Sequence, residues 1–107
     1  MATRKEYVTY ILEQLSGLED VRSRAMMGEY LLYYKDRLFS GIYDDRFLVK
    51  PVSAAVRLMP DARWELPYSG AKEMLLVEQT DDRAFLETLL SAMYSELPEP
   101  KKKKKKA

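Results

Sequence analysis

The segment from residue 24 to residue 50 most constrains how this chain can fold. It reads RAMMGEYLLYYKDRLFSGIYDDRFLVK, with apolar and aromatic residues between two charged groups, Lys35-Asp36-Arg37 and Asp44-Asp45-Arg46. Runs of strand-forming residues that are separated by short charged breaks are typical of antiparallel strands joined by turns. We therefore expect a meander of two or three strands at the heart of the domain.

The charged breaks predict the strand limits. We expect strands at residues 37–43 and 46–50, joined by Asp44-Asp45 as a tight hairpin connection. Gly28 is expected to interrupt the first strand, as a bulge or a point of close backbone approach. A last strand at residues 73–78 is nearly continuously apolar, which is consistent with burial on both faces, and residues 61–71 form an irregular loop.

Helical periodicity appears on both sides of the meander. Apolar residues recur at helical spacing in residues 3–18, where Thr3 is a plausible N-cap and Gly17 a plausible stop. A short helix capped by Ser53 is expected to reach Met59, and a long helix opens at residues 80–82. The whole pattern predicts an α+β fold, a small antiparallel sheet packed with an N-terminal and a C-terminal helix plus one short central helix.

Composition excludes several classes of chemistry. The 107 residues suit one domain, and they include neither Cys nor His. Without these residues there is no thiolate nucleophile and no imidazole base, and a transition-metal site would depend on carboxylates alone. We expect no metal and no cofactor. No apolar stretch approaches the roughly 18 residues of a membrane helix, so we expect a cytoplasmic protein with no membrane span.

The charge is unevenly distributed. Residues 1–100 carry 12 basic and 17 acidic side chains, a net charge of −5, whereas the whole chain has a formal charge of +1. The difference comes from a run of six lysines, Lys101, Lys102, Lys103, Lys104, Lys105 and Lys106. We expect a disordered tail at residues 98–107 that makes weak, nonspecific contact with polyanions such as nucleic acid, or that only solubilises the chain.

Several residues carry a resemblance to a known family. They are Arg24-Ala25-Met26-Met27-Gly28, Leu32-Tyr33, Phe39, Gly41-Ile42 and Asp44-Asp45-Arg46-Phe47-Leu48-Val49-Lys50. Their order and spacing resemble the N-terminal domain of the TfoX (Sxy) family, whose pattern is close to R-x-M-F-G-G-x-x-L-Y followed by F-G-x-I-x-D-D-x-L-Y-L-K. The resemblance covers residues 4–97. It departs at Met27 and Glu29, where the family often has Phe and a second Gly.

The resemblance implies a fold and a role but no catalytic residue. Members of the family are similar to regulators of natural competence that act on transcription with partner proteins, and full-length members add a C-terminal helical domain. This chain has no room for such a domain, so it resembles a stand-alone N-terminal domain over residues 1–97. The resemblance implies a regulatory module with a protein partner.

The candidate binding residues are few. Trp64 and Tyr68 could form an aromatic lip for a ligand or peptide, or could pack a long loop against the core. Lys50 could point into a cleft toward Tyr68 or Glu73, or could lie at a rim. The carboxylates Asp44 and Asp45 are interpreted as a solvated turn in preference to a cation site.

Two functional hypotheses follow from these residues. The preferred one is a non-enzymatic interaction module that binds a protein through the sheet and the aromatic loop. The alternative is a small-molecule-binding domain or enzyme with a cleft near Lys50, Tyr43 and Tyr68, in which Glu73 acts as acid or base. A homodimer through an exposed edge strand or the tyrosine-rich face is left open.

Overall fold

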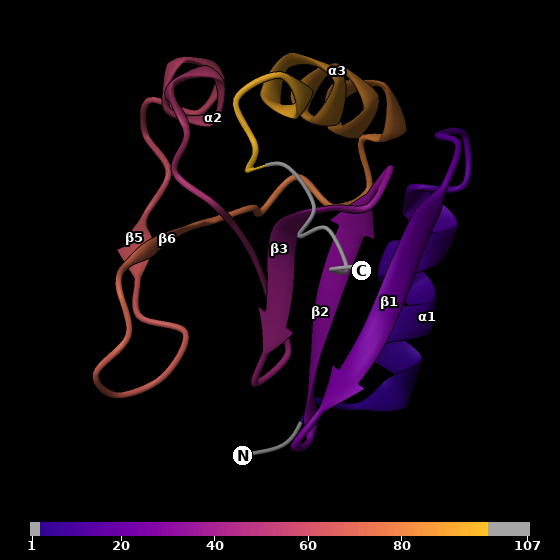
Figure 1. The fold of residues 1–107 in the computed structure, drawn as a ribbon, viewed down its shortest axis with the longest axis vertical. Coiled ribbons are helices and arrows are strands. Elements are labelled where there is room, and N and C mark those ends of the chain that lie inside the picture. The colour runs from indigo at the N-terminus through magenta and orange to yellow at the C-terminus, as the bar shows by residue number, and fades with distance from the viewer. Residues whose placement is uncertain (1–2, 99–107) are drawn as a thin grey trace, which may run out of the picture.

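The computed structural model describes residues 3–98, and it has the predicted α+β fold (Figure 1). The elements are α1 (Lys5–Gln14), β1 (Val21–Met26), β2 (Glu29–Tyr34), β3 (Arg37–Tyr43), β4 (Arg46–Val49), α2 (Ser53–Leu58), β5 (Trp64–Glu65), β6 (Met74–Leu76) and α3 (Arg83–Tyr94). The predicted N-terminal, central and C-terminal helices are all confirmed. The predicted tail, apart from Pro98, lies outside the described residues.

One six-stranded sheet has the order β1-β2-β3-β4-β6-β5, and all neighbouring strands are antiparallel. Two-residue turns join the first four strands, and both residues of each turn have positive φ: Met27 and Gly28, Lys35 and Asp36, Asp44 and Asp45. Positive φ at both positions is the type I′ geometry, whose twist matches that of the strands it joins. The predicted hairpin at Asp44-Asp45 is confirmed.

The first hairpin differs from the expectation. Gly28, with φ of 88°, belongs to the turn between β1 and β2 and does not interrupt a strand. Strand β1 begins at Val21 and forms a separate strand from β2. The sequence signal was weak because β1 is an edge strand, and five of its six residues are exposed. The one irregularity of the meander lies instead between β2 and β3, where the register shifts at Leu32 and Tyr33.

The far edge of the sheet also differs. Leu75 is buried, but Met74 and Leu76 on either side are only half-buried, so β6 is not covered on both faces. The expected loop at residues 61–71 contains the short strand β5, which pairs with β6 through Trp64 and Leu75. A two-residue strand is too short to produce a periodic pattern in the sequence.

The three helices begin in different ways. Thr3 does not cap α1, since its hydroxyl donates to the carbonyl of Ile42 at 3.0 Å. Ser53 is the first residue of α2, and the carboxylate of Glu96 accepts the N–H of Ala54 at 2.8 Å. Asp82, within the predicted opening at residues 80–82, caps α3, because its carboxylate accepts the N–H of Phe85 at 3.0 Å.

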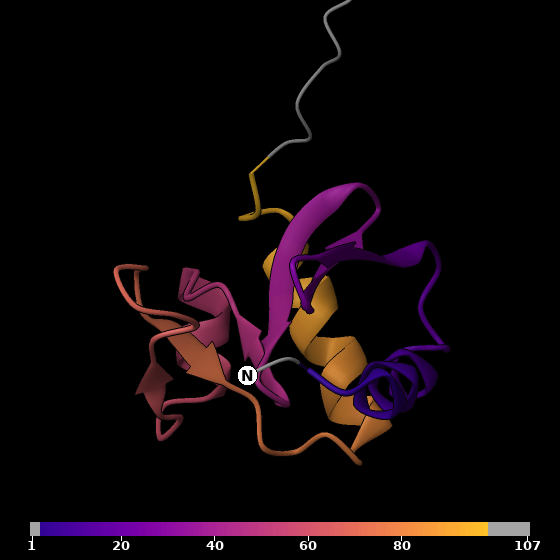
Figure 2. The same ribbon diagram turned by 90° about the horizontal axis from the view of Figure 1, so that it is seen from below.

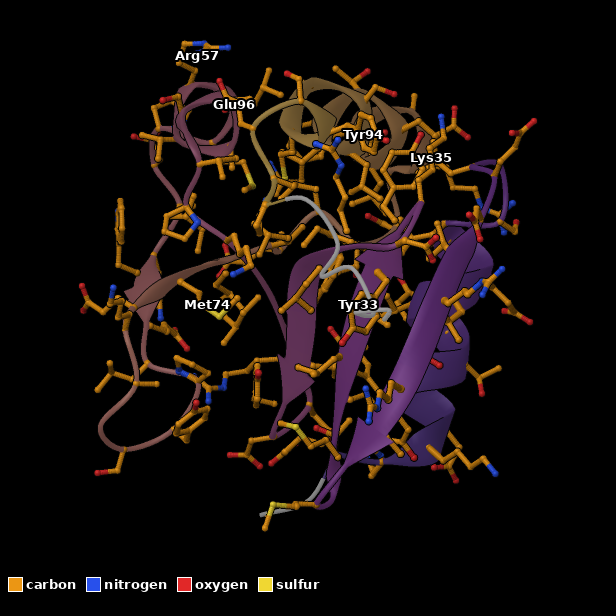
Figure 3. The ribbon with its side chains drawn as sticks, in the orientation of Figure 1. Tyr33, Lys35, Arg57, Met74, Tyr94 and Glu96 are labelled. Atoms are coloured by element: carbon orange, nitrogen blue, oxygen red, sulfur yellow. The ribbon has the colours of Figure 1, made fainter. Side chains whose placement is uncertain are left out.

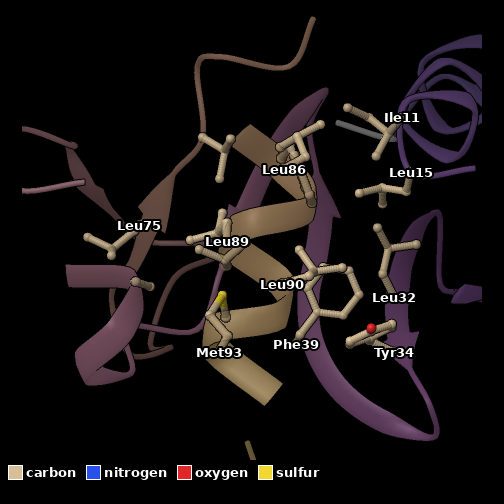
Figure 4. Packing of buried hydrophobic residues seen from close by; sticks show 14 of the residues in the cluster. Ile11, Leu15, Leu32, Tyr34, Phe39, Leu75, Leu86, Leu89, Leu90 and Met93 are labelled. Carbon is tan, nitrogen blue, oxygen red and sulfur yellow. The ribbon is translucent and has the colours of Figure 1, made fainter. Parts of the chain in front are cut away.

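All three helices contribute to one core on one face of the sheet (Figures 2 and 4). From the strands this core takes alternate residues, such as Leu32 and Tyr34 of β2 and Phe47 and Val49 of β4. Alternation along a strand directs the intervening residues to the opposite face. The sheet therefore has a helix-covered inner face and an outer face.

Candidate functional site

The outer face is defined here by the residues that alternate with the core: Leu31, Tyr33, Leu38, Gly41, Tyr43 and Leu48. Of these six residues, Gly41, Tyr43 and Leu48 are buried, whereas Leu31, Tyr33 and Leu38 are half-buried. None of the helices in residues 3–98 packs over this face. Figure 3 shows Tyr33 within the meander and Met74 beside the β5–β6 hairpin.

Tyr43 covers the centre of this face. A Cβ atom added at Gly41 would lie only 2.1 Å from the Cε2 atom of Tyr43, so the ring occupies the space above Gly41. Tyr68 packs on Tyr43 with ring centroids 5.8 Å apart, and Tyr68 is itself 59% exposed. Burial raises the pKa of Tyr43 above its ordinary value, with smaller contributions from Tyr68 and Glu29. The phenol of Tyr43 therefore stays protonated at neutral pH.

Arg46 holds the loop that carries Tyr68. Its Nη1 atom donates to the Glu65 carboxylate at 2.8 Å and to the Leu66 carbonyl at 3.1 Å, and its Nη2 atom donates to the Pro67 carbonyl at 3.3 Å. The Arg46–Glu65 pair is about three-quarters buried, so solvent screens it less than a surface ion pair. The sequence does not identify Arg46 as a loop-binding residue, because no local pattern links it to a loop about 20 positions later.

The structure brings together only two of the five candidate residues, Tyr43 and Tyr68. Lys50 is half-buried and follows β4 at the end opposite Arg46, about 13 Å along the strand from it. Glu73 is exposed just before β6. Trp64 is 49% exposed, and it pairs with Leu75, a core residue on the inner face. The aromatic lip of Trp64 and Tyr68 therefore stays a prediction.

A cavity lies elsewhere. It has a volume of about 350 Å³ and is formed by residues at the end of α2 and the end of β6: Leu58, Met59, Pro60, Asp61, Ala62, Leu76, Glu78 and Gln79. None of the five candidate residues lines it. The cleft near Lys50 and Tyr68 stays a prediction.

The two aspartates of the third hairpin have different roles. Asp45 accepts the backbone N–H and the Nε–H of Arg4, both at 2.9 Å, and these bonds hold its pKa below the ordinary value. Asp44 is exposed. Among residues 3–98 there is no group of three or more acidic side chains placed to hold a metal ion. Asp45 therefore fastens the start of the chain to the turn.

Membrane insertion of a helix is not indicated. The helices within residues 3–98 are all too short or too polar to cross a bilayer.

Comparison with known proteins gives a family without a stated activity. No family model matches the chain, and no solved structure matches it. A protein of Spirochaeta aurantia, described as "Uncharacterized 12.7 kDa protein in trpE 5'region", is 31% identical over 107 residues, which are 99% of this chain and 93% of that protein. The chain belongs to the family of this spirochaete protein. Since the match covers nearly the full length of both chains, family membership applies to the whole sheet-and-helix unit. The resemblance to TfoX and the binding role of each candidate residue stay predictions.

Proposed function

We propose that this chain is a non-enzymatic interaction module that binds a partner protein through the outer face, with Tyr68 as its main exposed contact. The observation that carries the proposal is that three helices cover one face of the sheet. On the other face no helix of the described residues lies over the half-buried Leu31, Tyr33 and Leu38, and Tyr68, which packs on Tyr43 there, is 59% exposed. Tyrosines on a rigid support are typical of protein interfaces, because they bury a large area and lose little side-chain entropy.

The arrangement of Tyr68 supports this role. Its ring contacts Tyr43, and three hydrogen bonds from Arg46 fix its loop. The position of the exposed Tyr68 ring is therefore constrained before any partner binds. A preorganised contact loses less conformational entropy on binding than a mobile one. The candidate residue types also favour contact over catalysis, because the chain has no His or Cys and the raised pKa of Tyr43 removes it as a base near neutral pH.

The resemblance to the TfoX N-terminal domain supports a regulatory role in the cytoplasm, of the kind described for competence regulators. The run of six lysines would then be a weak, nonspecific tether to nucleic acid. In this proposal the outer face selects the partner protein and the lysines only raise the local concentration near a polyanion.

The proposal is tested by capturing a partner protein with the tagged chain and then measuring the affinity of the purified partner. Tagged full-length chain should recover a defined protein, whose affinity is then measured by calorimetry for the wild type and for Tyr68→Ser. Loss of a well-placed interface tyrosine should weaken binding about thirtyfold or more, corresponding to roughly 2 kcal/mol. The matched control is Trp64→Ser, because Trp64 is a similarly exposed aromatic residue that pairs on the inner side.

Equal loss in both variants, or no loss in either, would refute binding at the outer face. So would turnover of a metabolite by the pure chain in the absence of any protein partner.

The alternative of small-molecule binding has one observation in its favour. The cavity between α2 and β6, at about 350 Å³, lies within the usual size range of ligand sites. A thermal-shift screen tests it, since a tight ligand raises the melting temperature. A hit whose effect is lost on Leu76→Trp, which would fill this cavity, and kept on Tyr68→Ser would favour the alternative.

A further inference from the structure

Strand β1 is a long free edge of the sheet. It has six residues, its sole neighbour in the sheet is β2, and every residue after Val21 is exposed. The opposite edge, β5, has only two residues. An edge strand has backbone N–H and C=O groups directed away from its neighbour, and these can pair with an extended segment of another chain. Of the two edges, β1 therefore has much the greater capacity for added pairing.

Helix α1 provides support beneath this edge. Figure 1 shows α1 behind β1, and Figure 2 shows the helix below the strand when the molecule is turned. One side of α1 is engaged elsewhere, since Tyr10 bonds Thr80 and Gln14 bonds Arg83. Helical periodicity places Leu12, with Lys5 and Thr9, on the other side. A strand added beside β1 would thus lie near this side of α1, where Lys5 and Thr9 are exposed and Leu12 is partly buried against the core.

The exposed side chains of β1 have one sign of charge. Arg22 and Arg24 point to the outer side, directly opposite Tyr33 and Leu31 of β2. Arg22 shares a 3.0 Å contact with Asp20, whereas no hydrogen bond or ion pair joins Arg24 to another residue of the described chain. The folded body around this strand is acidic overall, with 12 basic and 17 acidic side chains in residues 1–100. The edge therefore has an unneutralised positive charge on an otherwise acidic body.

The arginines discourage pairing with a second copy. Directly opposite residues in an antiparallel pair point to the same side of the sheet. Two antiparallel registers pair five residues of β1 with β1 of a second copy and keep both outer faces on the same side of the joined sheet. One register places Arg22 opposite Arg24 of the other copy, and the other register places the two Arg24 residues opposite each other. Like charges directly opposite are destabilising. The same positions would be favourable if the incoming strand carried carboxylates.

From the free edge, the helix beneath it and the two arginines, we infer that β1 takes up an extended acidic segment of a partner protein as a seventh strand. Alternate acidic residues of the segment would pair with Arg22 and Arg24 on the outer side, and the apolar residues between them would lie over α1. This inference rests on the proposed interaction function, and it adds the chemical class of the partner. It uses the edge of the sheet, whereas Tyr68 lies on the face.

The test uses full-length chain and two synthetic peptides, acetyl-Glu-Val-Glu-Val-Glu-Val-amide and its lysine counterpart with Lys at each Glu position. Backbone amide resonances and dissociation constants are followed by NMR titration. The acidic peptide should shift resonances of Val21–Met26 and slow their amide exchange, and it should leave Trp64–Glu65 unchanged. Arg24→Glu should weaken binding of the acidic peptide about fivefold, corresponding to about 1 kcal/mol for one cross-strand pair. The same change should strengthen binding of the lysine peptide.

Arg63→Glu is the matched control, because Arg63 is also exposed and lies next to the other edge. Arg24→Gln should give an intermediate loss, which separates charge from folding defects. Absence of shifts in β1, equal binding of both peptides, or equal effects at residues 24 and 63 would overturn the inference. Concentration-dependent shifts of β1 without peptide would identify a second copy as the occupant and would also overturn it.

The two proposals fail separately. If a captured partner depends on Tyr68 but is insensitive to Arg24→Glu, the outer-face function stands and the edge inference falls. If β1 takes the acidic peptide while Tyr68→Ser leaves partner binding unchanged, the outer-face function falls and the edge retains its role.

Discussion

Gly41 illustrates, at the scale of single residues, how a missing side chain shapes the outer face. The Tyr43 ring lies where a Cβ of residue 41 would be, and its position in turn supports Tyr68. Arg46 completes the arrangement by holding the carbonyls of Leu66 and Pro67. The exposed tyrosine thus depends on a glycine and an arginine that would not contact a partner themselves.

Replacing Gly41 by Ala should displace the Tyr43 ring. We expect a loss of about 2 kcal/mol in the free energy of unfolding, because an added methyl group in a filled space forces its neighbours to move. Urea denaturation of Gly41→Ala measures the loss. In the Tyr43→Ala background the same change should cost nothing or stabilise slightly, since Ala is better than Gly in a strand once the clash is gone. An equal cost in both backgrounds would show that the ring does not lie over Gly41.

At the scale of elements, the meander is built from three two-residue turns with positive φ at both positions. Only one of the six turn residues, Gly28, is a glycine. Left-handed backbone is unfavourable for residues with a side chain, and Asp tolerates it better than most. Strong pairing along β2 and β3 offsets this strain, because each of these strands lies between two neighbours. The turns are therefore places where the fold can be stabilised.

Asp36 is the suitable position, with φ of 69° and no hydrogen bond from its side chain to the described chain. Asp36→Gly should raise the free energy of unfolding by about 0.5 kcal/mol, because relief of left-handed strain exceeds the added freedom of the unfolded chain. Urea midpoints of the variant and the wild type measure the gain. The opposite change, Gly28→Ala at φ of 88°, should destabilise by about 1 kcal/mol. A destabilised Asp36→Gly would contradict the strain argument.

For the whole molecule, the main feature is the difference between its two sides. Helices α1, α2 and α3 bury the inner face, whereas the outer face is only partly buried and the β1 edge is exposed. Charge is divided as well, between an acidic body and six consecutive lysines. In the function proposed above, the protein partner and the polyanion would therefore contact separate parts of the chain.

Removing the six lysines should abolish attraction to polyanions. Without Lys101 to Lys106 the net charge falls from +1 to −5, so the remaining chain should be repelled by heparin or duplex DNA at low salt. Retention on a heparin column, measured across a salt gradient, checks this expectation. Six glutamines in place of the lysines keep the chain length as the control and should behave like the deletion. Undiminished retention would place the polyanion contact on the folded body.

Local patterns in the sequence were sufficient for much of the fold. Helical periodicity predicted α1 and α3, residues 80–82 marked the start of α3, and the charged pair Asp44-Asp45 marked a hairpin. These features depend on residues within a few positions of one another, so sequence alone can carry them. Edge strands β1 and β5 were missed, because exposure and shortness remove the alternation that identifies a strand.

The binding surface was decided by tertiary structure. Tyr43 and Tyr68 were both candidates, but the contact between their rings depends on a loop that Arg46 holds by hydrogen bonds to Glu65, Leu66 and Pro67. Lys50, Glu73 and Trp64 looked equally suitable in the sequence, and chain geometry places them elsewhere. The sequence by itself determined which segments form strands and helices, since those preferences are local. Which side chains meet, and which face stays open, depended on contacts between residues twenty or more positions apart, and no local pattern records those contacts.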